Sequence, residues 1–258
     1  MWTYPLALAI ASVAVALLER LTPARRWQPA LRRGFLSDLA FLVLNGHFLG
    51  VGLAWVAART VDPLLGARFD LHLASSWPLW VQAPVAIVVL DFAQWTIHNL
   101  LHRVPWLWEF HKVHHSVRDG EMDWIVSFRF HWAEVVVYKT LQYLPLALLG
   151  FAGEALMIHA VVGTVVGHLN HANLDWGHGP WRYVLNSPRM HLWHHDADAT
   201  AGRNFGIIFS AWDWLFGTAY LPDHPPRRLG YRGQEEMPPG FLRRSLWPLL
   251  PLHPGKPT

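Results

Sequence analysis

Two stretches of this sequence repeat one spacing of histidines, His111-Lys-Val-His114-His115 and His191-Leu-Trp-His194-His195. On a helix, positions i, i+3 and i+4 fall on one face, so each stretch places three imidazoles side by side. Two further groups also have helical spacings: His98 with His102, and His168 with His171. Imidazole nitrogens that face one way are common metal ligands. The four groups therefore predict a metal site.

Ten of the 17 histidines belong to these groups. They are His98, His102, His111, His114, His115, His168, His171, His191, His194 and His195. Zinc uses four ligands at a structural site and three plus water at a catalytic one, so ten ligands are too many for one zinc. Two octahedral ions could use five imidazoles each and keep one open position per metal. Nitrogen ligands suit iron, zinc, copper or nickel, so the residues alone leave the metal open.

Two carboxylates stand where they could support such ligands, since a ligating imidazole usually passes its other N–H to a carboxylate or carbonyl. Asp91 lies seven residues before His98 and on the same helix face, and Glu134 begins an apolar run. Both could equally cap helices or pair with arginines. The isolated histidines are predicted to be packed or hydrogen-bonded residues: His47, His72, His159, His178, His224 and His253.

The composition favours a bilayer. The chain has 258 residues, 52% of them hydrophobic and 15% charged, against about 25% charged in soluble domains. The sequence has no cysteine, so disulfides and cysteine-ligated zinc or iron–sulfur centres are excluded within it. The net charge is +3, but the arginines flank apolar segments and form no basic stripe, so nucleic acid is not a predicted partner.

Apolar runs suggest four to five membrane spans, because a spanning helix needs about 20 apolar residues. The runs are 2–18, 36–58, 77–97, 132–149 and 155–167. The last run is short, follows directly after Glu154 and contains His159, so it either spans or re-enters. Five arginines between Arg20 and Arg33 mark that loop as cytoplasmic. Counting crossings from there places all four histidine groups on the cytoplasmic side.

The predicted fold is thus all-α, a multi-pass membrane helical bundle with a cytoplasmic helical cap that carries the two-metal site. It forms one domain over residues 1–258, with N-terminal spans in 1–90, a histidine-bearing region in 91–222 and a proline-rich tail in 223–258. The tail is expected to be extended and to rest Phe241, Leu246 and Trp247 on the membrane surface. The expected location is a bacterial cytoplasmic membrane.

A longer set of motifs surrounds the histidines. It runs from Asp91 through His98-x3-His102, Leu107-Trp-Glu-Phe-His111-Lys-Val-His114-His115-Ser116, Arg129-x-His131-x-x-Glu134, His168-x-x-His171-Ala-Asn173, Pro188-x-x-His191-x-x-His194-His195 and Asn204-Phe-Gly206 to Asp213-x3-Phe-Gly217-Thr218. In these residues the chain resembles the fatty acid hydroxylase/sterol desaturase superfamily of integral membrane di-iron oxygenases. The resemblance implies that the ten histidines bind two irons, with O2 as oxidant and a lipid, such as a fatty acyl chain or sterol, as substrate.

Hydroxylation and desaturation of a C–H bond both fit this site. The substrate is expected in an apolar slot that opens to membrane lipid, with Phe110, Trp124, Phe128 and Phe130 as candidates to line it. The sequence contains no dinucleotide fingerprint and no iron–sulfur ligand set. Electrons must therefore come from a separate reductase, ferredoxin or cytochrome-type carrier at the cytoplasmic face.

Other functions fit the same residues. An alkylglycerol-ether monooxygenase, a carotenoid oxygenase or a sterol-modifying enzyme would keep the site and change the substrate. A membrane metal-binding or transport protein would also use histidines, but transport calls for ligands along the spans. Here the histidines gather at span ends, which favours a fixed site.

Overall fold

The computed structural model describes residues 3–57, 59–60, 64, 71–117, 119–198 and 202–249. Within these residues all regular elements are helices, apart from two isolated β-bridges, which confirms the all-α prediction. The elements are α1 (Thr3–Leu21), α2 (Phe35–Ala40), π-helical η1 (Phe41–Leu49), α3 (Gly50–Val56), α5 (Leu79–Arg103), α6 (Pro105–His115), 3₁₀-helical η3 (Trp124–Phe128), α7 (Trp132–Leu148), α8 (Gly153–His171), η4 (Gly179–Tyr183), α9 (Pro188–His194), α10 (Ala211–Phe216), η5 (Gln234–Glu236) and α11 (Phe241–Leu246).

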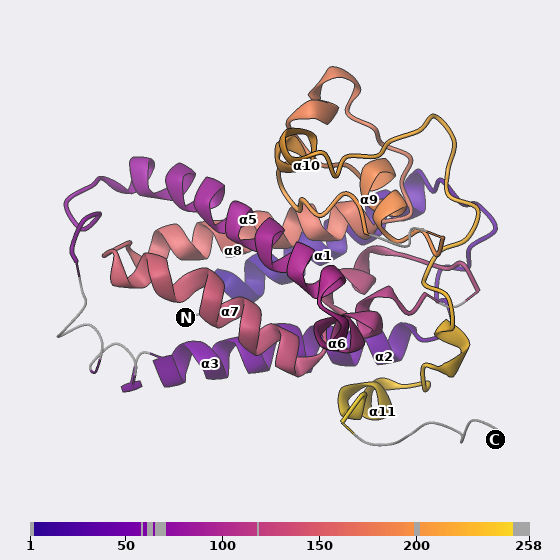
Figure 1. Cartoon of the computed structure of the whole chain (residues 1–258), viewed down its shortest axis with the longest axis horizontal. Coiled ribbons are helices and arrows are strands. Elements are labelled where there is room, and N and C mark those ends of the chain that lie inside the picture. The colour runs from indigo at the N-terminus through magenta and orange to yellow at the C-terminus, as the bar shows by residue number, and fades with distance from the viewer. Residues whose placement is uncertain are drawn as a thin grey trace.

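The five apolar runs form the long helices of the fold (Figure 1). Helices α2, η1 and α3 follow one another without a break, and α5 continues past its apolar run to include His98 and His102. The predicted hairpin between the last two runs is confirmed, with Gly150 at φ +80° in the turn between α7 and α8. Helix α8 packs against both α1 and α5, so it lies at the centre of the bundle.

The arginine-rich loop after α1 lies beside the histidine-bearing segments. The Arg25 backbone N–H donates to Asn173 Oδ1 at 2.8 Å, and the Arg25 guanidinium donates to the Met122 carbonyl. At the other end of the bundle, the Leu71 N–H donates to the Leu148 carbonyl at 3.0 Å. The arginine-rich loop and the histidine-bearing segments thus lie at the same end of the bundle, as counting crossings predicted. The assignment of this end to the cytoplasm stays a prediction.

A buried ion-pair network fixes this end of the bundle. Arg32 pairs with Asp38 of α2 and with Asp123, the latter at 2.8 Å. Arg129 donates to both carboxylate oxygens of Asp38 at 2.6 and 2.7 Å. All four side chains are nearly excluded from solvent, so removing one would leave an uncompensated charge inside the protein. The network ties the arginine loop, α2 and η3 into one unit.

Exposed apolar surface on the long helices points to a membrane protein. Residues Phe35–Val56 and Leu79–Arg103 are long and apolar enough to span a bilayer, and only 17% of the most apolar stretch of the first is buried. Helix α1 exposes a stripe of Leu6, Ile10, Val13 and Leu17, each 58–60% accessible. Such contiguous apolar surface needs an apolar environment. Helix α7 is shorter, at 17 residues.

The described part of the tail is not extended, which corrects the sequence-based expectation. Trp247 is 3% exposed, packs against Phe41 and Val113, and donates its indole N–H to the Glu109 carbonyl at 3.1 Å. Burying the ring while satisfying its N–H favours docking on α6 over a place at the surface. Leu246, by contrast, is half exposed. Residues 250–258 lie outside the described residues.

Candidate metal centre

Nine of the ten predicted histidines converge in two groups. The first, called the five-histidine group, consists of His98, His102, His111, His115 and His194. The second, called the four-histidine group, consists of His114, His171, His191 and His195. In each group, one nitrogen per residue lies within 4.8 Å of all the others.

Each of the two H-x-x-H-H motifs contributes histidines to both groups, but the positions that join each group are reversed between the motifs. In α6 the first and last histidines, His111 and His115, join the five-histidine group, while His114 joins the other. In and just after α9 the roles reverse: the middle residue, His194, joins the five-histidine group and the outer two join the four-histidine group. One H-x-x-H-H motif therefore bridges two sites, where the sequence suggested a three-nitrogen face.

The spacing of the ring nitrogens fits bound cations. Around an ion with metal–nitrogen bonds of about 2.1 Å, adjacent octahedral ligands lie about 3.0 Å apart and opposite ones about 4.2 Å apart. His171 Nε2 lies 3.0 Å from His191 Nε2, 3.2 Å from His114 Nε2 and 3.3 Å from His195 Nε2. In the five-histidine group, His98 Nε2 lies 3.2 Å from His111 Nε2.

Protons alone do not satisfy these nitrogens. His171 Nδ1 lies 2.7 Å from the Gly167 carbonyl, which can only accept, so in the neutral ring Nε2 carries a lone pair. Three other imidazole nitrogens crowd around that lone pair. Buried nitrogens without a hydrogen-bond partner among the described residues include His102 Nε2, His115 Nε2 and His194 Nε2. A cation in each group would satisfy them, because unpaired buried polar atoms are costly.

Burial keeps the histidines of the two H-x-x-H-H motifs neutral. Burial, and secondarily the neighbouring imidazoles, lower the pKa of His111, His114 and His115 of α6 well below its usual value. The same causes lower the pKa of His191, His194 and His195. Neutral imidazoles at pH 7 present the lone pairs that metal binding requires.

Carbonyl and carboxylate oxygens orient three more rings in the way that the Gly167 carbonyl orients His171. His98 Nδ1 donates to the Phe205 carbonyl at 2.8 Å, and His194 Nδ1 donates to the Arg203 carbonyl at 2.7 Å. His111 Nδ1 lies 2.8 Å from Glu134 Oε1. These contacts place a proton on Nδ1 and turn Nε2 toward the group, an arrangement that is typical of ligating histidines. Glu134 thus stands where the sequence suggested, and its other oxygen has no partner among the described residues.

Asp91 hydrogen-bonds to the segment behind the histidines, and none of its hydrogen bonds within the described part of the chain involves an imidazole. Its carboxylate accepts from the backbone N–H groups of Ile208 and Phe209 and from Trp212 Nε1. Asp213, which was not among the predicted site residues, accepts hydrogen bonds from the backbone N–H groups of Phe205 and Gly206. The two carboxylates therefore hold the loop whose Phe205 carbonyl orients His98. In the sequence, the Asp213-x3-Phe-Gly217-Thr218 motif marks this residue but does not indicate what its carboxylate contacts.

The structure does not bring His168 into either group. Its Nε2 lies 3.0 Å from Ser12 Oγ of α1, and its Nδ1 lies 2.7 Å from Ser127 Oγ of η3. Both ring nitrogens are thus occupied by hydroxyls, and the imidazole joins α8 to two neighbouring elements. The expected count of five ligands per metal is met by the first group only.

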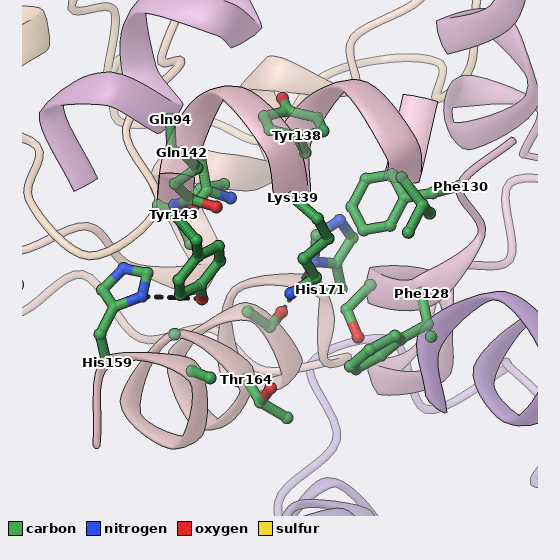
Figure 2. A pocket seen from close by; sticks show the side chains of 17 residues that line it. Gln94, Phe128, Phe130, Tyr138, Lys139, Gln142, Tyr143, His159, Thr164 and His171 are labelled. Carbon is green, nitrogen blue, oxygen red and sulfur yellow. Dashed lines mark hydrogen bonds between the residues drawn. The ribbon is translucent and has the colours of Figure 1, made fainter. Parts of the chain in front are cut away.

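A pocket between α7 and α8 leads to the four-histidine group (Figure 2). It is lined by His171, by Phe128 and Phe130, and by two glycines of α8. Of the other aromatic candidates, Phe110 packs against His131 and Trp124 against His168. A Cβ at Gly46 of η1 would lie 2.2 Å from the Phe128 ring, so a glycine there lets this ring stand at the pocket wall.

Comparison with known proteins agrees with this site. The profile of the fatty acid hydroxylase family matches residues 83–218. Ornithine lipid hydroxylase OlsE of Rhizobium tropici is 30% identical over 245 residues, 91% of this chain and 72% of that protein. Very-long-chain aldehyde decarbonylase GL1-10 of Oryza sativa subsp. japonica is 26% identical, covering 81% and 71%. Alkylglycerol monooxygenase of Homo sapiens is also 26% identical, covering 58% of this chain and 32% of that protein.

No solved structure is significantly similar to this one. The profile match nevertheless spans just over half of the chain and contains all nine converging histidines. The similarity to the R. tropici protein extends over nearly the whole sequence. The chain therefore belongs to the fatty acid hydroxylase family.

Proposed function

We propose that this protein is a multi-pass membrane oxygenase that uses O2 and external electrons to hydroxylate, or desaturate, a C–H bond of a lipid. The observation that carries the proposal is the convergence of nine histidines, eight of them buried, in two groups, one of which borders a pocket between helices. The relatives described above, named as an ornithine lipid hydroxylase, a very-long-chain aldehyde decarbonylase and an alkylglycerol monooxygenase, support oxidation of a lipid.

The residues present fit two iron ions, one held by each histidine group. When bound, the two irons would supply the activation of O2: in hydroxylation one oxygen atom enters a C–H bond and the other leaves as water, and in desaturation both leave as water, with two electrons and two protons consumed in either case. The protein's part is to hold the Nδ1 protons away from the metals. The carbonyls of Phe205, Arg203 and Gly167 and the Glu134 carboxylate accept hydrogen bonds from those N–H groups.

An unactivated alkyl chain offers no group for acid–base catalysis, so positioning and exclusion of water are what the fold contributes. The pocket beside His171 would hold the chain, with the Phe128 and Phe130 rings as its walls. The exposed apolar helices would place its mouth in the bilayer. We place the histidine groups on the cytoplasmic side, where a soluble carrier can deliver electrons.

The five-histidine group borders a different pocket. His102 is half-buried and borders a second, more polar pocket together with Arg103 and Arg203. An electron carrier with an acidic surface would suit this approach, whereas lipid would enter on the His171 side. A transport path is less well supported, because it calls for ligands along the spans, whereas these nine rings form one compact cluster.

The test is to purify the protein in detergent, measure its metals by mass spectrometry, and compare lipid extracts of cells expressing wild type and His194→Ala. We expect two irons per wild-type chain and a lipid that gains oxygen or loses hydrogen only with the wild type. The matched control is His224→Ala, which removes an exposed imidazole outside both groups. Fewer than two metals in fully loaded wild type, with no altered lipid, would refute the proposal.

A further inference from the structure

Lys139 places an ammonium group in the middle of an apolar helix. It lies seven residues after the start of α7 and nine before its end, so its Cα is about 10 Å or more from either end of the helix. A side chain this deep cannot easily bring its charge to water at a span end. Charged residues at such depth usually serve function, because they are expensive to keep.

Within the described part of the chain, Lys139 has no carboxylate partner, because no Asp or Glu oxygen lies within 4.0 Å of its Nζ. Its Nζ lies 5.0 Å from the centroid of the Tyr143 ring. Glu134, the acidic residue of α7, is engaged with His111. The amine is thus positioned at this site without a bound carboxylate.

Lys139 lines the pocket that reaches the four-histidine group. The α8 side of this pocket includes His159, Gly163, Gly167 and His171, spaced four residues apart and so on one helix face. Figure 2 shows Lys139 between His171 and the Tyr143–His159 pair. Tyr143 and His159 are hydrogen-bonded at 3.0 Å, and α7 and α8 form a hairpin, so Lys139, one turn before Tyr143, is level with Gly163.

Neutral polar side chains share the otherwise apolar pocket wall with Lys139. The Gln142 amide donates to the Leu90 carbonyl and to Gln94, which fixes its orientation at the pocket wall. His159 is 2% exposed, and its Nε2 has no hydrogen-bond partner among the described residues. Positive charge beside polar donors, without an acidic group, is the chemistry that binds an anionic oxygen.

We infer that Lys139 binds an anionic oxygen of the lipid, a carboxylate or a phosphate, while the acyl chain runs toward His171. Along α8, the eight residues from Gly163 to His171 correspond to about 12 Å. The substrate class is then an anionic lipid, oxidised along its chain at a fixed distance from the charged group. The inference rests on the proposed function for the oxidation, but the binding step requires no metal.

The test measures binding to the full-length protein in lipid nanodiscs by scintillation proximity. One pair of probes is tritiated oleate and methyl oleate, and the other is oleyl phosphate and oleyl alcohol. The ratio of dissociation constants within each pair is compared between proteins, so that partition into lipid cancels. The variants are Lys139→Met, which keeps length and loses charge, and Lys139→Arg, which keeps charge. Arg59→Met, outside the pocket, is the matched control.

We expect wild type to prefer at least one anionic probe by about tenfold or more, as a charged hydrogen bond would provide. Lys139→Met should lose that preference, while Lys139→Arg and Arg59→Met retain it. Preference for oleate alone identifies a carboxylate, and preference for oleyl phosphate alone identifies a phosphate. Equal binding of charged and neutral probes by wild type would overturn the inference, as would an unchanged preference in a folded Lys139→Met protein.

The outcome is separable from that of the proposed function. An anionic preference in a protein that oxidises no lipid would leave the binding site standing and remove the oxygenase. Oxidation of a lipid by a protein without that preference would do the reverse.

Discussion

Glu134 holds His111 by its Nδ1 proton inside a space closed to solvent, with both side chains fully buried. Glu134→Ala should leave that N–H unpaired and free the ring to rotate, so metal affinity or activity should fall about 10- to 100-fold. Glu134→Gln keeps an accepting oxygen and should fall less. Metal content per chain and product formation measure the effect. Glu154→Ala, at the exposed start of α8, is the control, and full metal content in Glu134→Ala would contradict the role.

His168 and His171 lie only three positions apart on α8, but only His171 belongs to a histidine group. Because hydroxyls of Ser12 and Ser127 occupy His168, we expect His168→Gln to keep two metals per chain. It should lose stability through those two contacts, by about 1–3 kcal/mol for each group left unpaired. His171→Ala should instead lose the metal of the four-histidine group. Metal analysis beside thermal unfolding distinguishes the two, and loss of metal in His168→Gln would restore it as a ligand.

At the scale of elements, α8 combines two tasks: its C-terminal end provides His171, and one face forms the pocket. Gly163 and Gly167 have the spacing of a helix-packing motif, but a Cβ at either would meet nothing within 4 Å. The helix leaves space along this face where close packing would be expected from the motif. That space is the part of the pocket between Lys139 and the histidines.

Gly163→Leu should therefore fill the pocket without disturbing the fold. We expect substrate oxidation to fall by at least about tenfold, since a small displacement of substrate from the reacting geometry is costly. Both metals should remain bound. Lipid products and metal content are measured together, with Gly52→Leu on the exposed face of α3 as control. Unchanged oxidation in Gly163→Leu would show that substrate does not use this pocket.

At the scale of the molecule, the arginine loop and the histidines lie at one end and the α7–α8 turn at the other. The sequence has no cysteine, so single cysteines can report this directly. Arg33→Cys and Arg227→Cys, both exposed, should react with a membrane-impermeant maleimide from the same side. Ser75→Cys, beside the α7–α8 turn, should react from the opposite side. Labelling of Arg33→Cys and Ser75→Cys from one side would contradict a membrane-spanning bundle.

The helical spacing of the histidines predicted groups of imidazoles on helix faces, because i, i+3 and i+4 positions share a face whatever the fold. Counting the ligands predicted two metals, and counting crossings predicted that the groups meet. The partners of those rings were not predictable in the same way. Phe205 and Arg203 contribute backbone carbonyls from an irregular segment, and Asp213 acts only by shaping it. His168 has the right spacing, but Ser12 reaches it from α1, 156 residues away. Trp247 docks on α6 through a contact between residues 138 apart in the sequence.

The opposite use of the two H-x-x-H-H motifs has a consequence for how the protein acquires its metals. Helix α6 contributes to both groups, and so does the segment from His191 to His195. Ordering the five-histidine group therefore also orders three of the four ligands of the other group, and ordering the four-histidine group orders three of the other five. Loading should therefore be cooperative. As metal is titrated into the stripped protein, native mass spectrometry should find chains with no ion or two, and few with one. A cell short of metal would then hold fewer complete enzymes, not a population of half-filled ones.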